Sequence, residues 1–368
     1  MCTQNHQLKH IDKYIVGRFL KTYLFSILIL AFIIIVFDIS EKIDDFTDDR
    51  ASGASVWDII IDYYLNFVPF LINQFNALFV FISVIFFTSK MASKSEIIAI
   101  FNSGVSFYRL LLTYVITAIG LFAVNLLMTF WVIPEANKVR IDFENKFIRN
   151  APYFNKKNTH VQIDSNSYVY FHSFNIKRNT AYKFSLEKFD GQNLIYKLNA
   201  SFAVWDSTDN LWTIKNYHVR EIDGINEKLY SGNKLDTALN IQPRDFKSWL
   251  NDVQTMNQAE LIDFIEREKF KGSSQVKEYE VEKHKRLAFP FASIILTIMG
   301  FSLASRKIRG GIGMHIGLGM LLCFTYILIS QMAFVYVAQS DMNTILGVWI
   351  PNIIYTIITA ILLYKAPK

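Results

Sequence analysis

The segment FLKTYLFSILILAFIIIVFDI, residues 19–39, contains an apolar run long enough to cross a bilayer. A transmembrane helix needs about 20 mostly apolar residues, whereas the apolar core of a cleavable signal peptide is shorter and precedes a small-residue cleavage site. We therefore expect this segment to remain as a membrane anchor. Further runs of this kind lie within residues 59–89, 110–133, 287–304, 312–337 and 346–364, so that the sequence predicts six transmembrane helices.

The positions of lysine and arginine predict the orientation of these helices. Basic residues crowd one set of helix ends, and only Lys42 and Arg50 lie in the opposite short loops. Because basic loops stay in the cytoplasm, we expect both termini to be cytoplasmic and the long segment between the third and fourth spans to lie outside. The net charge of +6 therefore reflects membrane topology and does not indicate nucleic-acid binding. The basic residues on the cytoplasmic side are Lys9, Lys13, Arg18, Lys21, Lys90, Lys94, Arg109, Arg306, Lys307, Arg309, Lys365 and Lys368.

The outer segment is polar and has the pattern of an all-β domain. Alternating runs at residues 167–174, 182–189 and 211–219 are separated by turn sequences such as Asp190-Gly191 and Asp223-Gly224. This spacing is typical of an antiparallel sandwich or barrel. The sequence Asn257-Gln-Ala-Glu260 then resembles a helix start with a capping box.

The sequence contains no convincing catalytic or cofactor site. The glycine-rich run of residues 310–319 opens a membrane span and lacks the Lys-Ser/Thr ending of a phosphate-binding loop. Gly313 and Gly317, four residues apart, favour close helix packing, and His315 has no second metal ligand at a suitable spacing. Cys2 and Cys323 are too far apart in the sequence to suggest a disulfide framework. We therefore expect no enzyme and no metal or cofactor bound by this chain.

Two polar patches leave alternatives open. Asp62, Asn66, Asn73 and Asn76 share one face of the second span around Pro69, where they either form hydrogen bonds between helices or line a pathway. The acidic stretch of residues 38–50 surrounds Lys42. This stretch is either a solvated loop or a binding place in which Lys42 contacts an anionic head group. In the second case the acidic residues either repel the head group or bind divalent cations that accompany it.

Residues 89–106, between the second and third spans, predict a short amphipathic helix. Ser93 or Ser95 can cap it, Glu96 lies in its first turn, and Gly104 ends it. Its apolar residues are Ile97, Ile98 and Phe101. Such a helix is either a contact for a peripheral partner or a connector on the membrane surface.

The order of these features resembles the lipopolysaccharide export permease family LptF/LptG, also called YjgP/YjgQ. The resemblance rests on five segments that occur in order along nearly the whole chain. They are the basic amphipathic start at residues 12–20, the segment Ser-Glu-Ile-Ile-Ala-Ile-Phe-Asn-Ser-Gly at 95–104, Pro134-Glu-Ala-Asn137, Lys285-Arg-Leu-Ala-Phe-Pro290 and Trp349-Ile-Pro-Asn352.

The resemblance implies a multi-pass permease subunit in the inner membrane of a Gram-negative bacterium. Residues 1–133 would form spans one to three, 134–255 a periplasmic β-jellyroll domain, 256–286 a periplasmic helix and linker, and 287–368 spans four to six. Such subunits pair with a sister permease and a cytoplasmic ATPase dimer, which supplies ATP and Mg²⁺. They extract lipopolysaccharide and pass it to a periplasmic bridge protein for transport to the outer membrane; whether a further single-span subunit joins stays open.

The resemblance also implies roles for individual residues. The segment from Ser95 to Gly104 matches the family's coupling helix, with Glu96 as the acid that engages the ATPase. The basic residues Lys42, Lys138 and Arg140 lie where family members place positive charge near lipid phosphates. Spans one and five would line a side opening towards lipid, to which Gly313, Gly317 and Gly319 contribute small residues.

Two alternatives come from other classes of protein. One is a membrane scaffold that anchors a periplasmic binding module without transport, and it would not depend on an ATPase. The other is a different ATP-binding-cassette permease with a periplasmic domain, for lipoprotein release or efflux. Those permeases commonly have four spans, so the prediction of six spans favours the lipopolysaccharide exporter.

Overall fold

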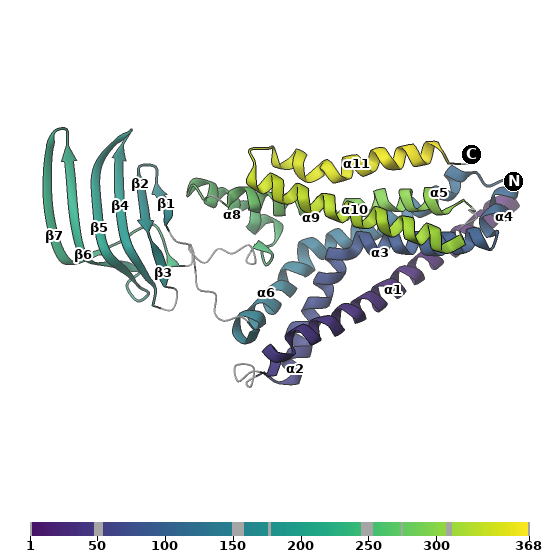
Figure 1. Cartoon of the computed structure of the whole chain (residues 1–368), viewed down its shortest axis with the longest axis horizontal. Helices are drawn as coiled ribbons and strands as arrows, with labels where there is room; N and C mark the ends of the chain where they lie inside the picture. Colours follow the sequence, from purple (N-terminus) through teal and green to yellow (C-terminus); the bar gives the residue numbers. More distant parts are fainter. Residues whose placement is uncertain are drawn as a thin grey trace. The chain divides into compact units, whose positions relative to one another are not determined.

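The computed structural model of the chain describes residues 2–47, 54–148, 158–175, 178–243, 253–273, 275–306 and 311–366. They form two compact units, whose elements are labelled in Figure 1. The helical unit comprises Met1–Ile148, Gln254–Gln258 and Glu280–Lys368, and the sheet unit comprises Arg149–Val253 and Ala259–Tyr279.

The helical unit confirms the six predicted spans. Its membrane-crossing segments are His10–Asp44, Val56–Ser93, Phe107–Ile148, Val276–Ala304, Gly313–Gln339 and Thr344–Tyr364. The first, fourth, fifth and sixth segments belong to the single helices α1 (Cys2–Thr47), α9 (Val276–Ala304), α10 (Gly311–Gln339) and α11 (Thr344–Tyr364).

The second and third spans are composite helices interrupted by π-helical turns. The second joins α2 (Val56–Asp58), η1 (Ile59–Tyr64) and α3 (Leu65–Ser93). The third joins α5 (Phe107–Leu127), η2 (Met128–Val132), α6 (Ile133–Phe143) and η3 (Glu144–Ile148). Pro134 lies at the beginning of α6, directly after the π-helical turn η2, and the helical run is not broken there. The helix therefore continues through Pro134, at which the predicted outer domain begins, and ends at Ile148.

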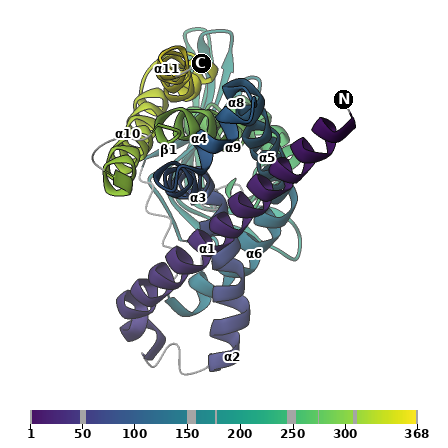
Figure 2. The same cartoon turned by 90° about the vertical axis from the view of Figure 1, so that its right-hand side faces the viewer.

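α3 lies at the centre of the helical unit, with α1 on one side and α10 on the other (Figure 2). It contributes to two apolar clusters. The first joins α3 to α1, α4 (Glu96–Asn102), α5 and α9, and the second joins it to α9, α10 and α11. Both chain termini and α4 lie at one end of this unit, here called the terminal end, and α2 lies at the opposite, distal end (Figure 1).

The sheet unit contains one antiparallel sheet of seven strands, which confirms the predicted inserted all-β domain. The strand order is β1-β2-β4-β5-β6-β7, with β3 paired to β4. Tight turns at Gly191 and Gly224, both in the left-handed region, join the longest strands at the predicted positions. The strands are β1 (Thr159–Asp164), β2 (Ser167–Phe171), β3 (Ser173–Asn175), β4 (Thr180–Asp190), β5 (Asn193–Asp206), β6 (Leu211–Asp223) and β7 (Asn226–Thr237).

One face of this sheet carries the core of the unit. Fully buried Trp212 donates its indole N–H to the carbonyl of Ile241 at 2.8 Å and packs against Phe184 and Trp205. Satisfying the indole N–H is what allows so large a residue to be buried. The predicted helix after the sheet is α8 (Gln258–Phe270), in which Phe264 contacts the ring of Tyr279.

Candidate functional site

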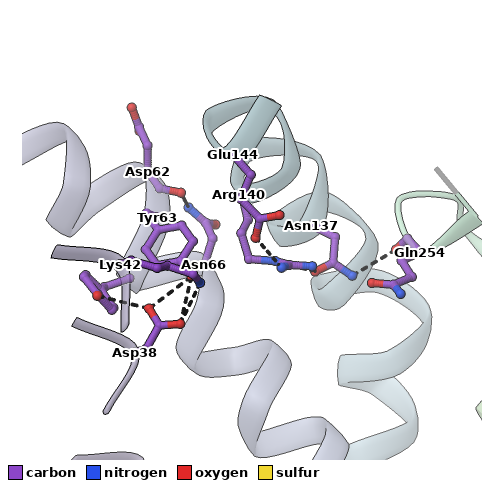
Figure 3. A network of polar contacts seen from close by, with 10 residues as sticks. Asp38, Lys42, Asp62, Tyr63, Asn66, Asn137, Arg140, Glu144 and Gln254 are labelled. Atoms are coloured by element: carbon purple, nitrogen blue, oxygen red, sulfur yellow. Dashed lines mark hydrogen bonds and ion pairs between the residues drawn. The ribbon is translucent and has the colours of Figure 1, made fainter. Parts of the chain in front are cut away.

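Lys42, a predicted substrate contact, lies near the distal end of α1 and is bound by groups of its own chain (Figure 3). Its Nζ lies 2.6 Å from Asp38 Oδ1, one helical turn earlier, and donates to the Tyr63 hydroxyl. Asp38 Oδ2 also accepts from the hydroxyls of Tyr63 and Tyr64, both at 3.1 Å. Because Asp38 is only 8% exposed, the ammonium of Lys42 compensates a buried carboxylate.

Arg140, another predicted substrate contact, is buried in a second polar group at the distal end (Figure 3). Its Nη1 donates to Glu144 Oε1 at 2.6 Å, and its Nε and Nη2 donate to Asn137 Oδ1. Asn137 in turn donates to the carbonyl of Gln254 at 3.0 Å. The guanidinium also lies 4.5 Å from the ring centroid of Phe70. All of these contacts are internal to the helical unit.

An aromatic layer joins these two groups. Tyr63 stacks on Phe67 at 5.3 Å and contacts Phe143 at 5.7 Å between ring centroids. Phe143 directly precedes Glu144, the partner of Arg140. The structure therefore brings Lys42 and Arg140 into one aromatic and polar cluster, although each cation is already paired with a carboxylate.

Lys138 differs from the other two predicted contacts because its side chain is 43% exposed. It forms an ion pair with Glu135 at 2.7 Å, and that carboxylate is 68% exposed. Such pairs on a helix surface are weak. Of the three predicted basic residues, Lys138 is the one whose charge is accessible to a ligand.

A pocket of about 150 Å³ lies inside the helical unit near the Arg140 group. Its polar lining includes Asn73 of α3, Asn125 of α5 and Thr129 of η2, together with Lys285 and Arg286 of α9. Asn73 Oδ1 accepts from Asn125 Nδ2 and from Thr129 Oγ1, both at 2.9 Å. The two partners of Asn73 could not be predicted from sequence, since they lie on another span and leave no local signal.

Part of the polar face predicted on the second span forms hydrogen bonds to other helices. Asn73 contacts the third span, and Asn76 accepts from Tyr23 of α1 at 2.6 Å. Asn66 instead donates to the carbonyls of Ile61 and Asp62 in its own span, which is consistent with the irregular turn there. The structure thus gives Asn73 and Asn76 a packing role.

The acidic stretch after the first span is only partly described. Asp48, Asp49 and Arg50 lie outside the described residues. Within the part of the chain that the structure describes, no group of three or more His, Cys, Asp or Glu residues is arranged to hold a metal ion.

The predicted coupling helix is α4, at the terminal end. Ser95 precedes it in the left-handed region, with a φ of 60°, and its side chain does not cap the helix. Ile97 is fully buried in the cluster shared with α1 and α5, whereas Ile98 is exposed. Gly104 follows the helix with a φ of 91°, a conformation that favours glycine.

Glu96 of α4 is held by α1. The Tyr14 hydroxyl donates to Glu96 Oε2 at 3.0 Å, whereas Glu96 Oε1 has no hydrogen bond to any described residue. Fully buried Ile15, next to Tyr14, belongs to the same apolar cluster as Ile97. The first span and the coupling helix are therefore joined by a hydrogen bond and by buried apolar contact. This contact could not be predicted from sequence, because 82 positions separate the two partners.

A second polar link joins α1 to α5, directly after α4. Arg109 binds Asp12 through two parallel contacts, Nη1 to Oδ1 at 3.1 Å and Nη2 to Oδ2 at 2.5 Å. Thr113 donates to Asp12 Oδ1 at 2.5 Å. A bidentate pair of this kind fixes orientation as well as distance. It holds α1 against α5, the helix that follows the turn at Gly104.

We expect Arg109→Ala to lower the free energy of unfolding by about 1 kcal/mol, since both side chains of the pair are about one-third exposed. Denaturant unfolding of the purified chain in detergent measures this change. Lys94→Ala, which removes an exposed cation at the same end, is the matched control. A double-mutant cycle with Asp12→Ala should show coupling between the two sites; fully additive effects would contradict the pairing.

The three glycines predicted at the side opening do not have equivalent surroundings in α10. No described atom lies within 4 Å of a Cβ built on Gly313 or Gly317. A Cβ on Gly319 would overlap the end of the Ile85 side chain of α3. Close helix approach within this chain also occurs at Gly300, where a Cβ would lie 3.1 Å from Val84 and 3.2 Å from Phe81. The first two glycines thus face outward from the described chain.

Comparison with known protein families gives one match. A family profile described as "Lipopolysaccharide export system permease LptF/LptG" matches residues 13–365. The match includes all six membrane-crossing segments except the start of the first, and it includes the inserted sheet. No curated protein matches the chain at a significant level.

Proposed function

Because the chain belongs to the lipopolysaccharide export permease family LptF/LptG, we propose that it is a membrane subunit of an ATP-binding-cassette exporter that extracts lipopolysaccharide from the inner membrane. The family match over residues 13–365 carries this proposal. The proposed assembly contains a sister permease, a cytoplasmic ATPase dimer and a periplasmic bridge protein that receives the lipid. The terminal end of the helical unit then faces the cytoplasm, in agreement with its basic residues.

The energy required for extraction supports a need for ATP. Each methylene of an acyl chain holds a lipid in the bilayer by about 0.8 kcal/mol. A glycolipid with several acyl chains therefore resists removal by tens of kcal/mol, far more than thermal motion supplies. The sequence has no phosphate-binding loop, so ATP and Mg²⁺ enter through the ATPase.

The contacts at the terminal end support α4 as the element that receives the motion of the ATPase. Glu96 and exposed Ile98 offer a polar and an apolar contact to a partner. Buried Ile97 and the Tyr14 hydrogen bond connect α4 to α1. A displacement of α4 would therefore move the first span, which the proposal places at the side opening for lipid.

The charges at the distal end support different roles for the three basic residues. The Lys138 side chain is 43% exposed, so a phosphate of the glycolipid can reach it. A phosphate at Lys42 or Arg140 would have to compete with Asp38 or Glu144, each of which already binds the cation. We assign the first encounter with substrate to Lys138 and a conditional contact to the other two.

A comparison of leucine substitutions at Gly317 and at Gly300 tests the proposed side opening. We expect Gly317→Leu to leave the chain folded, since its Cβ direction is open, but to reduce export at least tenfold by blocking approach of the sister subunit or lipid. Gly300→Leu should destabilise the chain, because its Cβ direction meets Phe81 and Val84. Thermal unfolding and an export assay separate the two effects. Normal export by Gly317→Leu would contradict the assigned opening.

Purification of the chain with its native partners and lipids tests the proposed function most directly. Mass spectrometry should identify a bound lipopolysaccharide, a second family member and an ATPase. A scaffold without transport activity would retain no ATPase, and a lipoprotein-release or efflux permease would retain a different substrate. Either result would contradict the proposal.

A further inference from the structure

An open groove of about 630 Å³ lies between α1 and α3 at the terminal end of the helical unit. Three basic residues of α1 line it, Lys13, Arg18 and Lys21, and all three are exposed. Gly17 lies among them, and no described atom lies within 4 Å of the position of a Cβ built there. The missing side chain at Gly17 keeps the middle of the groove open.

The positive charge of this groove is not compensated by described residues. Lys13, Arg18 and Lys21 form no ion pair with any described carboxylate, and Arg18 lies 5.3 Å from the ring centroid of Tyr14. Arg109 and Arg140 behave differently, since Arg109 binds Asp12 of α1 and Arg140 binds Glu144 in its own span. Three uncompensated cations on one concave surface favour an anionic ligand.

The other wall of the groove is apolar. It consists of Phe25 of α1 and Phe86 of α3, both exposed to the surroundings of the helical unit. Lys13 and Lys21 are eight residues apart on a helix, about 12 Å along its axis. The groove thus changes from basic to aromatic along α1, within the first membrane-crossing segment. A ligand that fits it needs a negative head and an apolar body.

We infer that this groove binds the phosphodiester head group of an acidic phospholipid, with the adjoining acyl chain against Phe25 and Phe86. The site lies at the terminal end, far along α1 from Lys42, and it takes a membrane lipid as a bound ligand, distinct from the exported glycolipid. Basic residues at a membrane surface recognise acidic lipids in this way. The apolar wall favours a lipid over free phosphate, because free phosphate has no apolar part that could contact Phe25 and Phe86.

The bound lipid would contact Tyr14, which also lines the groove. Because Tyr14 donates to Glu96 of α4, the head group would lie next to the hydrogen bond that connects the first span to the coupling helix. The inference concerns lipid binding alone and requires neither ATP nor lipopolysaccharide, so it can fail without affecting the proposed function.

A photo-crosslinking experiment tests this inference on the full chain in lipid nanodiscs. Benzoylphenylalanine replaces Phe86, and the bilayer contains phosphatidylcholine and phosphatidylglycerol. Mass spectrometry of the adducts should show phosphatidylglycerol enriched at least fivefold over its share of the bilayer. The triple variant Lys13→Gln/Arg18→Gln/Lys21→Gln should lose most of this enrichment, since each basic residue contributes about fivefold to binding of acidic lipid. Added inorganic phosphate should not displace the lipid.

Two further variants distinguish a site from general charge attraction. The triple variant Lys90→Gln/Lys94→Gln/Lys365→Gln removes three exposed cations at the same end outside the groove, and it should keep the enrichment. Gly17→Leu fills the groove without changing its charge, and leucine is a good helix former. This variant should therefore lower the enrichment. It also tests the site if the triple charge variant of the groove fails to fold. Equal loss in both triple variants, or no enrichment in the unsubstituted groove, would overturn the inference. Displacement of the lipid by inorganic phosphate would also overturn the inference. A groove variant that weakens ATPase binding but leaves the lipid enrichment unchanged would overturn it as well.

Discussion

Arg140→Ala should lower the free energy of unfolding by about 3 to 5 kcal/mol. The change removes the partner of Glu144, which is only 5% exposed, and leaves its carboxylate without the cation that now lies 2.6 Å away. It also removes the donors to Asn137 and the contact with Phe70. Unfolding of the purified chain in mixed micelles, titrated with sodium dodecyl sulfate, measures the loss.

Two variants identify the cause of this loss. Lys138 lies two residues before Arg140 and belongs to an exposed ion pair with Glu135. Lys138→Ala should therefore lower the free energy of unfolding by less than about 1 kcal/mol. Arg140→Met/Glu144→Met removes both buried charges, and it should be much more stable than Arg140→Ala, because no buried carboxylate is left without the Arg140 guanidinium. If Arg140→Ala unfolds at the same point as Lys138→Ala, Arg140 does not stabilise Glu144.

The same comparison bears on substrate binding. A transport defect in Arg140→Ala combines a loss of stability with any loss of phosphate contact. Lys138→Ala leaves the buried pair intact, so its transport defect reports the proposed contact directly. Export assays on both variants, normalised to folded protein, therefore separate the structural role of Arg140 from recognition of the glycolipid.

Glu96→Ala should weaken binding of the ATPase about tenfold or more while leaving the membrane subunit folded. Hydrogen bonds to a charged group contribute about 1.5 to 3 kcal/mol, and 1.4 kcal/mol corresponds to a tenfold change in the dissociation constant. Glu96 is partly exposed and its Oε1 can accept a hydrogen bond from the ATPase. The substitution should therefore reduce the affinity for the ATPase more than the stability of the permease. Titration of the reconstituted permease with purified ATPase measures the affinity, and the ATPase rate should fall in parallel.

Tyr14→Phe is the matched variant for this prediction. It removes the hydroxyl that binds Glu96 Oε2 but leaves the carboxylate in place for a partner. We expect it to retain ATPase binding and to reduce the transport obtained per ATP hydrolysed, because α4 then moves with a weaker hold on α1. Unchanged ATPase affinity in Glu96→Ala would contradict the assignment of α4 as the coupling helix.

The sequence predicted the transmembrane helices and the inserted sheet well, because both depend on local patterns. An apolar run such as residues 19–39 must be helical in lipid, where every backbone group needs an internal partner. The turns at Gly191 and Gly224 are set by residues that tolerate positive φ. Pro134 was a weaker guide, since the helical run of the third span passes through it without a break.

The sequence by itself determined the number of spans, the place of the all-β insertion, the short helix at Glu96 and the positions of the basic residues. Only the tertiary structure decided which of these charges are available. It paired Lys42 with Asp38 and Arg140 with Glu144, left Lys138 exposed, and joined Tyr14 to Glu96. The physical reason is that hydropathy and turn preference act between neighbours in the chain. The two ion pairs have the i,i+4 spacing of a single helix, but their burial and the contact of Tyr14 with Glu96 depend on helices that are distant in sequence and meet only in the fold.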